Sequence, residues 1–284
     1  MAQGSASSTS STSGEHRWHS YVAVGDSFTE GLQDPAPGGG YRGWADRLAT
    51  RLAATAEPDE PFHYANVAVR GKLIRQIAED QVPRACAMQP ALITIAAGGN
   101  DIIRPGTDPD EIAGIVDDVV SQLRGTGADV LIGTGFDTRE TPVLRRLRGK
   151  VGTYNAHLRA VADRHGCRVL DLWSMRVLQD PRAWDEDRLH LSGEGHRRVS
   201  LAACEALGIT PGGDWREPWP DQQRPSWQEQ RVEDLRWARE YLAPWIGRRL
   251  RGRSSGDGRC PKRPSLEPVQ ARREDGGCRA GARG

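Results

Sequence analysis

Three polar residues that lie far apart in this sequence could together carry out acyl transfer. Ser27 has a hydroxyl that becomes a good nucleophile only when a base takes its proton. His190 is the obvious base, because an imidazole titrates close to neutral pH. Asp187 lies three residues before His190, and on a turn this spacing lets the carboxylate reach Nδ1 and leaves Nε2 facing the serine. Asp187 could instead cap a helix, and neighbouring Asp185 could compete for its role.

Acyl transfer also needs hydrogen-bond donors that are fixed in advance around the developing oxyanion. The candidate donors are the backbone N–H of Ser27, the backbone N–H of Gly71 and the side-chain amide of Asn100. Gly71 has no Cβ, so its backbone could approach a substrate closely. Taken singly, each residue has an ordinary explanation as a turn, cap, surface or core residue. The combination is informative because all of them follow predicted strands or lie in the last loop.

The elements that must position these residues alternate between strand and helix along the chain. Short apolar runs predict strands at 21–24, 64–69, 91–97, 129–133 and 167–172. Helical periodicity and capping signals predict helices over 41–54, after 71, from 109, from about 142 and from 192. This alternation predicts an α/β fold with a parallel sheet covered on both faces. The loops after parallel strands emerge at one edge, so the candidate residues should converge there.

Composition divides the 284 residues into four parts. Residues 1–17 are rich in Ser, Thr and Gly and predict a disordered arm, and residues 18–210 predict the α/β domain. Residues 211–247 combine a Pro/Gly linker with a helix and hold five of the nine tryptophans, Trp215, Trp219, Trp227, Trp237 and Trp245. Because that much aromatic surface is unfavourable in water, we expect this segment to pack on the domain, with a partner or membrane surface as the alternative.

The last part, residues 248–284, has eleven Lys and Arg against four Asp and Glu and predicts a basic disordered tail. Such a tail could bind nucleic acid. No aromatic residue is interleaved to stack on bases, however, so we expect no nucleic-acid partner. Because the tail is expected to be disordered, we also expect no loss of turnover when the chain is cut after Gly247.

The sequence also limits the compartment and the cofactors. No stretch is apolar and long enough to form a transmembrane segment, and the amino-terminal residues lack the apolar core of a secretory signal. The five cysteines are scattered without a CxxC pair, which favours reduced thiols in a cytoplasmic protein. No HExxH motif or Cys/His cluster is present, so we expect neither a metal nor an organic cofactor.

Four blocks of this sequence resemble the conserved blocks of the GDSL/SGNH hydrolase family: Gly25-Asp-Ser27, Gly71, Gly99-Asn100-Asp101 and the segment from Asp187 to His196. The resemblance covers nearly all of residues 20–200. It implies a three-layer α/β/α, flavodoxin-like (SGNH hydrolase) fold, here with five parallel strands, a carboxy-terminal helical appendage and disordered tails. It also implies a GDSL-type esterase or acylhydrolase that cleaves small-molecule esters or thioesters through an acyl-serine.

The same resemblance implies roles for individual residues. Ser27 would be the nucleophile, His190 the base and Asp187 the orienting acid, and Ser27, Gly71 and Asn100 would form the oxyanion hole. His196 matches a position that is usually structural in such proteins. The segment after 211 resembles the Trp-rich and Arg-rich extension of actinobacterial members, for which no function is implied.

Two other functions compete with a hydrolase. A nucleotide-binding protein could use Gly133-Thr-Gly135 or the glycines at 38–40, but neither fits a dinucleotide fingerprint or a P-loop. A catalytically vestigial binding or regulatory protein could act through its basic tail, although all four blocks are intact. The substrate depends on loops 33–43, 102–108, 135–142 and 173–186, and the sequence does not give their shape.

Overall fold

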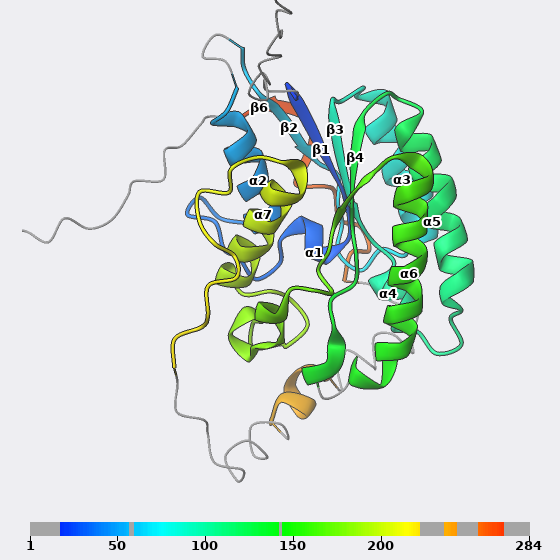
Figure 1. The fold of residues 1–284 in the computed structure, drawn as a ribbon, viewed down its shortest axis with the longest axis vertical. Helices are drawn as coiled ribbons and strands as arrows, with labels where there is room; N and C mark the ends of the chain where they lie inside the picture. The colour runs from blue at the N-terminus through cyan, green and yellow to red at the C-terminus, as the bar shows by residue number, and fades with distance from the viewer. Residues whose placement is uncertain (1–17, 57–59, 142–143, 222–235, 243–254, 270–284) are drawn as a thin grey trace, which may run out of the picture.

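A central six-stranded sheet organises the protein (Figure 1). The computed structural model describes residues 18–56, 60–141, 144–221, 236–242 and 255–269. The strand order is β5-β4-β3-β1-β2-β6. The five predicted strands are present and parallel: β1 (Ser20–Gly25), β2 (His63–Asn66), β3 (Leu92–Ala96), β4 (Asp129–Gly133) and β5 (Arg168–Leu170). The predicted α/β fold is therefore confirmed.

Helices cover both faces of the sheet (Figure 1). On one face lie α1 (Ser27–Glu30), α2 (Gly43–Ala53) and α7 (Gly193–Leu207). The other face carries α3 (Ile74–Ala87), α4 (Gly99–Ile102), α5 (Pro109–Arg124) and α6 (Arg148–His165). Among these helices of the described chain, none has both the length and the apolar character needed to cross a bilayer.

Short helical turns shape the loops around the candidate site. They are η1 (Thr138–Glu140), η2 (Leu144–Leu147), η3 (Arg176–Gln179), η4 (Pro181–Ala183) and the π-helical turn η5 (Ala238–Leu242). Asp108 caps α5 by accepting from the backbone N–H of Asp110, and Gly166 ends α6 in the left-handed conformation, as the local signals predict.

Alternation along β1 divides the core between the two faces. Tyr21 and Ala23 pack with the α2 and α7 layer, whereas Val22 and Val24 pack with the α3, α5 and α6 layer. All four side chains are fully buried. A strand covered on both faces is the normal state of a central parallel strand, which explains why the sequence shows a continuous apolar run there.

The strand order places a topological switch point beside β1. The chain passes from β1 to β2 on one side and returns to β3 on the other, so β1 lies between them. The connections after β1 and β3 then run to opposite faces of the sheet (Figure 1). Open α/β sheets hold ligands in the crevice at such a point, outside the carboxyl ends of the strands. Ser27 and Asn100 lie in the connections that leave this crevice.

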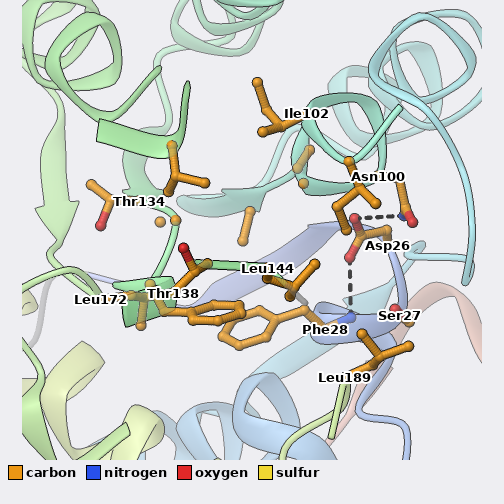
Figure 2. Close-up of a pocket in the computed structure, with 18 of the residues that line it drawn as sticks. Asp26, Ser27, Phe28, Asn100, Ile102, Thr134, Thr138, Leu144, Leu172 and Leu189 are labelled. Atoms are coloured by element: carbon orange, nitrogen blue, oxygen red, sulfur yellow. Dashed lines mark hydrogen bonds between the residues drawn. The ribbon is translucent and has the colours of Figure 1, made fainter. Parts of the chain in front are cut away.

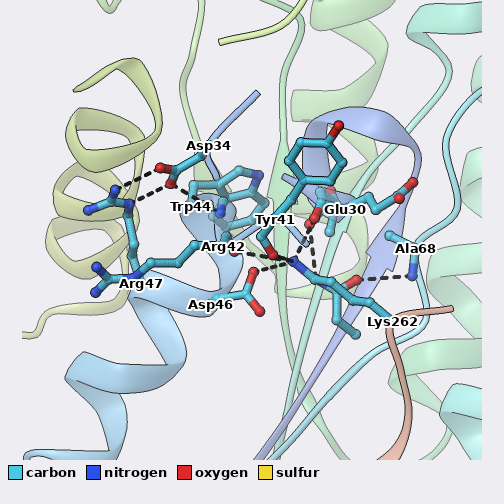
Figure 3. Close-up of polar contacts among 12 residues, drawn as sticks. Glu30, Asp34, Tyr41, Arg42, Trp44, Asp46, Arg47, Ala68 and Lys262 are labelled. Carbon is cyan, nitrogen blue, oxygen red and sulfur yellow. Dashed lines mark hydrogen bonds and ion pairs between the residues drawn. The ribbon is translucent and has the colours of Figure 1, made fainter. Parts of the chain in front are cut away.

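The sixth strand corrects two predictions. β6 (Arg263–Pro268) pairs antiparallel with β2, so the sheet has six strands rather than five, and residues 263–268 are not a disordered tail. The basic composition of this part of the chain does not mean a solvated tail, because Lys262 forms internal contacts. Its ammonium donates to the carbonyls of Glu30 and Tyr41 and lies 2.5 Å from Oδ2 of Asp46 (Figure 3).

Three of the five clustered tryptophans contact the domain. Trp215 and Trp219 pack against the core beside α7, and the guanidinium of Arg198 lies 4.2 Å from the centre of the Trp219 ring. Trp237 is 7% exposed. Trp227 and Trp245 lie outside the described residues, as does most of the helix predicted in this segment.

Candidate active site

The turn that carries Ser27 has no room for a side chain at its first position. Gly25 ends β1, and a Cβ there would lie 2.5 Å from the carbonyl oxygen of Ala96 in β3. The backbone N–H and carbonyl of Gly25 also bond to the amide of Gln81, each at 2.9 Å. These contacts hold the end of β1 against β3. As a result, Ser27 starts α1 at the mouth of the crevice, with its side chain lining a pocket.

His190 and Asp187 form a hydrogen-bonded pair. Nδ1 of His190 lies 2.6 Å from Oδ2 of Asp187. The other carboxylate oxygen accepts the backbone N–H groups of Leu189 and His190, both at 2.9 Å. Burial by itself would raise the pKa of Asp187, but its contacts with His190 lower that pKa overall. Because Nδ1 is bonded to the carboxylate, Nε2 is the nitrogen left for a substrate or a serine.

Of the two aspartates before His190, Asp187 is the one hydrogen-bonded to the imidazole. The backbone N–H of Asp185 donates to the carbonyl of His190, which closes the turn, while Asp187 makes the side-chain contact with the imidazole. Arg188, between them, has φ 53°, a left-handed conformation that is uncommon outside glycine. The hydrogen bond between Asp187 and His190 therefore depends on a tight turn of unusual backbone geometry.

Asn100 comes from the start of α4 and reaches the turn that carries Ser27. Its Nδ2 donates to Oδ2 of Asp26 at 3.0 Å (Figure 2). It also donates to the carbonyl of Lys72 at 3.2 Å. Asp26 also accepts the backbone N–H of Phe28. Burial raises the pKa of Asp26 to about 6. The amide of Asn100 can serve an oxyanion only by exchanging one of these two bonds.

The hydrogen bond between Asp26 and Asn100 could not be predicted from the sequence. Asp26 adjoins Ser27, and turn chemistry explained it as a cap. Its link to Asn100 joins residues 74 positions apart, and only the pairing of β1 with β3 brings them together.

Of the predicted oxyanion-hole residues, Gly71 is the one that does not line the pocket. It has φ 72°, as expected for a turn glycine. The carbonyl of the next residue, Lys72, accepts a hydrogen bond from the side-chain amide of Asn100, so the segment that holds Gly71 contacts this amide.

His196 belongs to the framework of the domain. It is 1% exposed, its Nδ1 accepts the backbone N–H of Trp44, and its Nε2 donates to the carbonyl of Leu32. Burial lowers its pKa to about 4. Both ring nitrogens are thus occupied by backbone groups, which agrees with the structural role expected for this position.

Ser27, Asn100 and His190 line one pocket of about 180 Å³, in which Figure 2 labels Ser27 and Asn100. Asp187 is bonded to His190 beside this pocket. Most of the pocket wall is apolar and includes Phe28, Ile102, Phe136, Leu144, Val151 and Leu172. Across the described part of the chain, no three His, Cys, Asp or Glu side chains are grouped as a metal site requires.

The topology and the position of this pocket define the class of the protein. A mostly parallel sheet between two helical layers, with the pocket at the switch point, is the three-layer fold of the SGNH hydrolases. The profile of the GDSL-like lipase/acylhydrolase family matches residues 23–198, and the chain belongs to this family of ester hydrolases. All five candidate residues lie within the match, whereas Trp237 and Lys262 lie beyond it.

Solved structures support the same fold. LAE5, an α/β hydrolase enzyme from the metagenome of Lake Arreo, is 25% identical, with a TM-score of 0.56 over 66% of this chain and 94% of its own. TesA is 20% identical, with a TM-score of 0.55 over 66% and 97%. Axe2, an acetylxylan esterase from Geobacillus stearothermophilus, is 19% identical, with a TM-score of 0.56 over 70% and 97%. Among curated proteins, none matches this sequence.

Proposed function

We propose that this protein is a serine hydrolase that cleaves carboxylic esters or thioesters through an acyl-serine intermediate. One observation carries the proposal: Ser27 and His190 line the same pocket, and His190 is bonded through Nδ1 to the buried carboxylate of Asp187. This arrangement has the parts of a nucleophile, a base and a group that orients the base.

In the proposed reaction, Oγ of Ser27 attacks the carbonyl carbon of the ester while Nε2 of His190 takes the serine proton. The tetrahedral intermediate collapses as His190 returns that proton to the leaving alcohol or thiol. Water then attacks the acyl-serine with His190 again as base, releasing the acid and restoring Ser27. Asp187 holds the imidazole in the tautomer that presents Nε2 and stabilises the imidazolium that forms.

The oxyanion is proposed to bind the backbone N–H of Ser27 and the amide of Asn100. Asn100 would exchange its bond to the Lys72 carbonyl for the oxyanion and keep its bond to Asp26, which fixes the amide plane. The backbone N–H of Gly71 is the third proposed donor and would have to come within reach when substrate binds. The apolar pocket wall supports an ester with a hydrocarbon acyl group.

The alternative of a vestigial site with a working basic tail has no observation in its favour. The hydrogen bond between His190 and Asp187 supports a working site instead, and part of that tail is a strand of the sheet.

Labelling with a fluorophosphonate tests the proposal. We expect covalent modification of Ser27 and no other serine. The Ser27→Ala variant should lose both labelling and hydrolysis of nitrophenyl esters, by at least about 10⁴-fold in kcat. Ser121→Ala is the matched control, since Ser121 is exposed on α5 and should leave both unchanged. A folded protein that is not labelled, together with full activity in Ser27→Ala, would refute the proposal.

A further inference from the structure

The turn that carries the proposed acid is held from outside the family-matched part of the chain. The indole N–H of Trp237 donates to the backbone carbonyl of Asp187 at 2.9 Å. The guanidinium of Arg188 lies 5.3 Å from the centre of the Trp237 ring. One helical turn further on, the hydroxyl of Tyr241 donates to the carboxylate of Glu186 at 3.2 Å. Three consecutive residues of the turn are thus contacted by residues 236–242.

These contacts act on the part of the turn where geometry matters most. The carbonyl of Asp187 belongs to the peptide plane that leads into Arg188, the residue with left-handed φ. Fixing that carbonyl fixes the direction from which the Asp187 side chain leaves the backbone. The carboxylate must meet Nδ1 of His190 at 2.6 Å, and a hydrogen bond this short tolerates little displacement.

A second contact reaches the nucleophile turn from the same carboxy-terminal region. The ammonium of Lys262 donates to the carbonyl of Glu30, the last residue of the short helix that Ser27 begins, and to the carbonyls of Tyr41 and Arg42 (Figure 3). Carbonyls at the end of a helix have no partner within the helix, so an ammonium there satisfies them and sets the position of α1.

We propose that the carboxy-terminal extension is a positioning element of the hydrolase site, in which Trp237 holds the Asp187 turn and Lys262 holds the Ser27 turn. This inference rests on the proposed function, because it gives the extension a role only if these two turns carry the catalytic groups. It reverses the expectation that cutting the chain after Gly247 leaves turnover intact, since the cut removes Lys262.

Trp237→Phe isolates the proposed contact, because phenylalanine keeps an aromatic ring but removes the indole N–H. The loss of one neutral hydrogen bond should lower kcat for a nitrophenyl ester by about three- to tenfold. KM should stay within about twofold of the wild type, since Trp237 does not line the pocket. Trp219→Phe is the matched control: its indole also donates to a backbone carbonyl, that of Val177 at 3.0 Å, but away from the catalytic turn.

Proton NMR provides a readout that does not depend on turnover. The Nδ1 proton of His190, bonded to Asp187, should resonate far downfield in the wild type and in Trp219→Phe, and should shift or broaden in Trp237→Phe. If this signal responds while the wild type hydrolyses no ester, the proposed function fails, and Trp237 then holds the Asp187 turn without positioning a catalytic group. The proposed positioning role is wrong if Trp237→Phe has the kcat and the proton signal of the wild type. It is also wrong if Trp219→Phe lowers kcat as much as Trp237→Phe does.

Discussion

Replacing Lys262 with methionine should destabilise the protein by an amount that depends on pH. The ammonium lies 2.5 Å from Oδ2 of Asp46, and the two side chains are 21% and 18% exposed. Removing one partner of a buried ion pair costs about 3–5 kcal/mol, because the other charge stays buried without compensation. Since this pair retains some exposure, we expect the free energy of unfolding to fall by an amount at the lower end of that range, about 3 kcal/mol at pH 8.

The sign of the pH dependence follows from Asp46. Burial raises the pKa of this carboxyl to about 6, although Lys262 acts to lower it. A carboxyl whose pKa is higher in the folded state stabilises the fold most when protonated, and that contribution is lost as pH rises through the folded pKa. Without Lys262 the pKa of Asp46 in the folded protein should rise further, so the variant goes on losing stability up to a higher pH than the wild type does. The gap between wild type and Lys262→Met should therefore be larger at pH 8 than at pH 5.

Urea unfolding followed by tryptophan fluorescence at both pH values measures this gap, with the slope m expected to be unchanged. The double variant Lys262→Met with Asp46→Asn serves as the control, because it removes the uncompensated charge. At pH 8 it should be more stable than Lys262→Met alone. Equal gaps at pH 5 and pH 8, or a double variant no more stable than the single one, would contradict the reasoning.

Two further predictions concern the site and its framework. Asp187→Asn should keep the fold but lower kcat by about 10⁴-fold, since the amide favours the wrong tautomer of His190, and a nitrophenyl ester assay beside a thermal melt checks this. His196, whose pKa is lowered to about 4 by burial, should make the wild type lose stability as pH falls from about 6.5 through 4, by up to about 3 kcal/mol. The His196→Gln variant should lack this part of the fall in stability between about pH 6.5 and pH 4, as measured by urea unfolding. A fall in His196→Gln equal to that of the wild type would show that another group is responsible.

Local signals in the sequence were sufficient for most elements of the fold. The five parallel strands and their helices could be predicted because each apolar run and each helical stripe reflects burial within its own element. The caps at Asp108 and Gly166 are likewise made by atoms a few residues away. These features depend on interactions between near neighbours, which spacing in the sequence records directly.

Contacts between residues far apart in the chain could not be predicted from the sequence. The segment 263–268 has one Arg, one Glu and two Pro among its six residues, and it becomes an edge strand only because β2 offers unpaired backbone groups and the Asp46 carboxylate accepts Lys262. The choice between Asp187 and Asp185 also needed the turn in three dimensions, since both lie close to His190 in sequence. The bond between Asp26 and Asn100 depends on the register of β1 against β3.

The sequence by itself determined which residues could do chemistry and at which edge of the sheet they would lie. Strand ends place Ser27 and Asn100, and the spacing of Asp187 and His190 predicts their contact. Only the tertiary structure decided what holds these groups in place. Trp237 lies 50 positions from Asp187, and Lys262 lies 232 positions from Glu30. Contacts at such separations leave no periodic pattern in the chain, because they arise from how separate elements pack rather than from how each one forms.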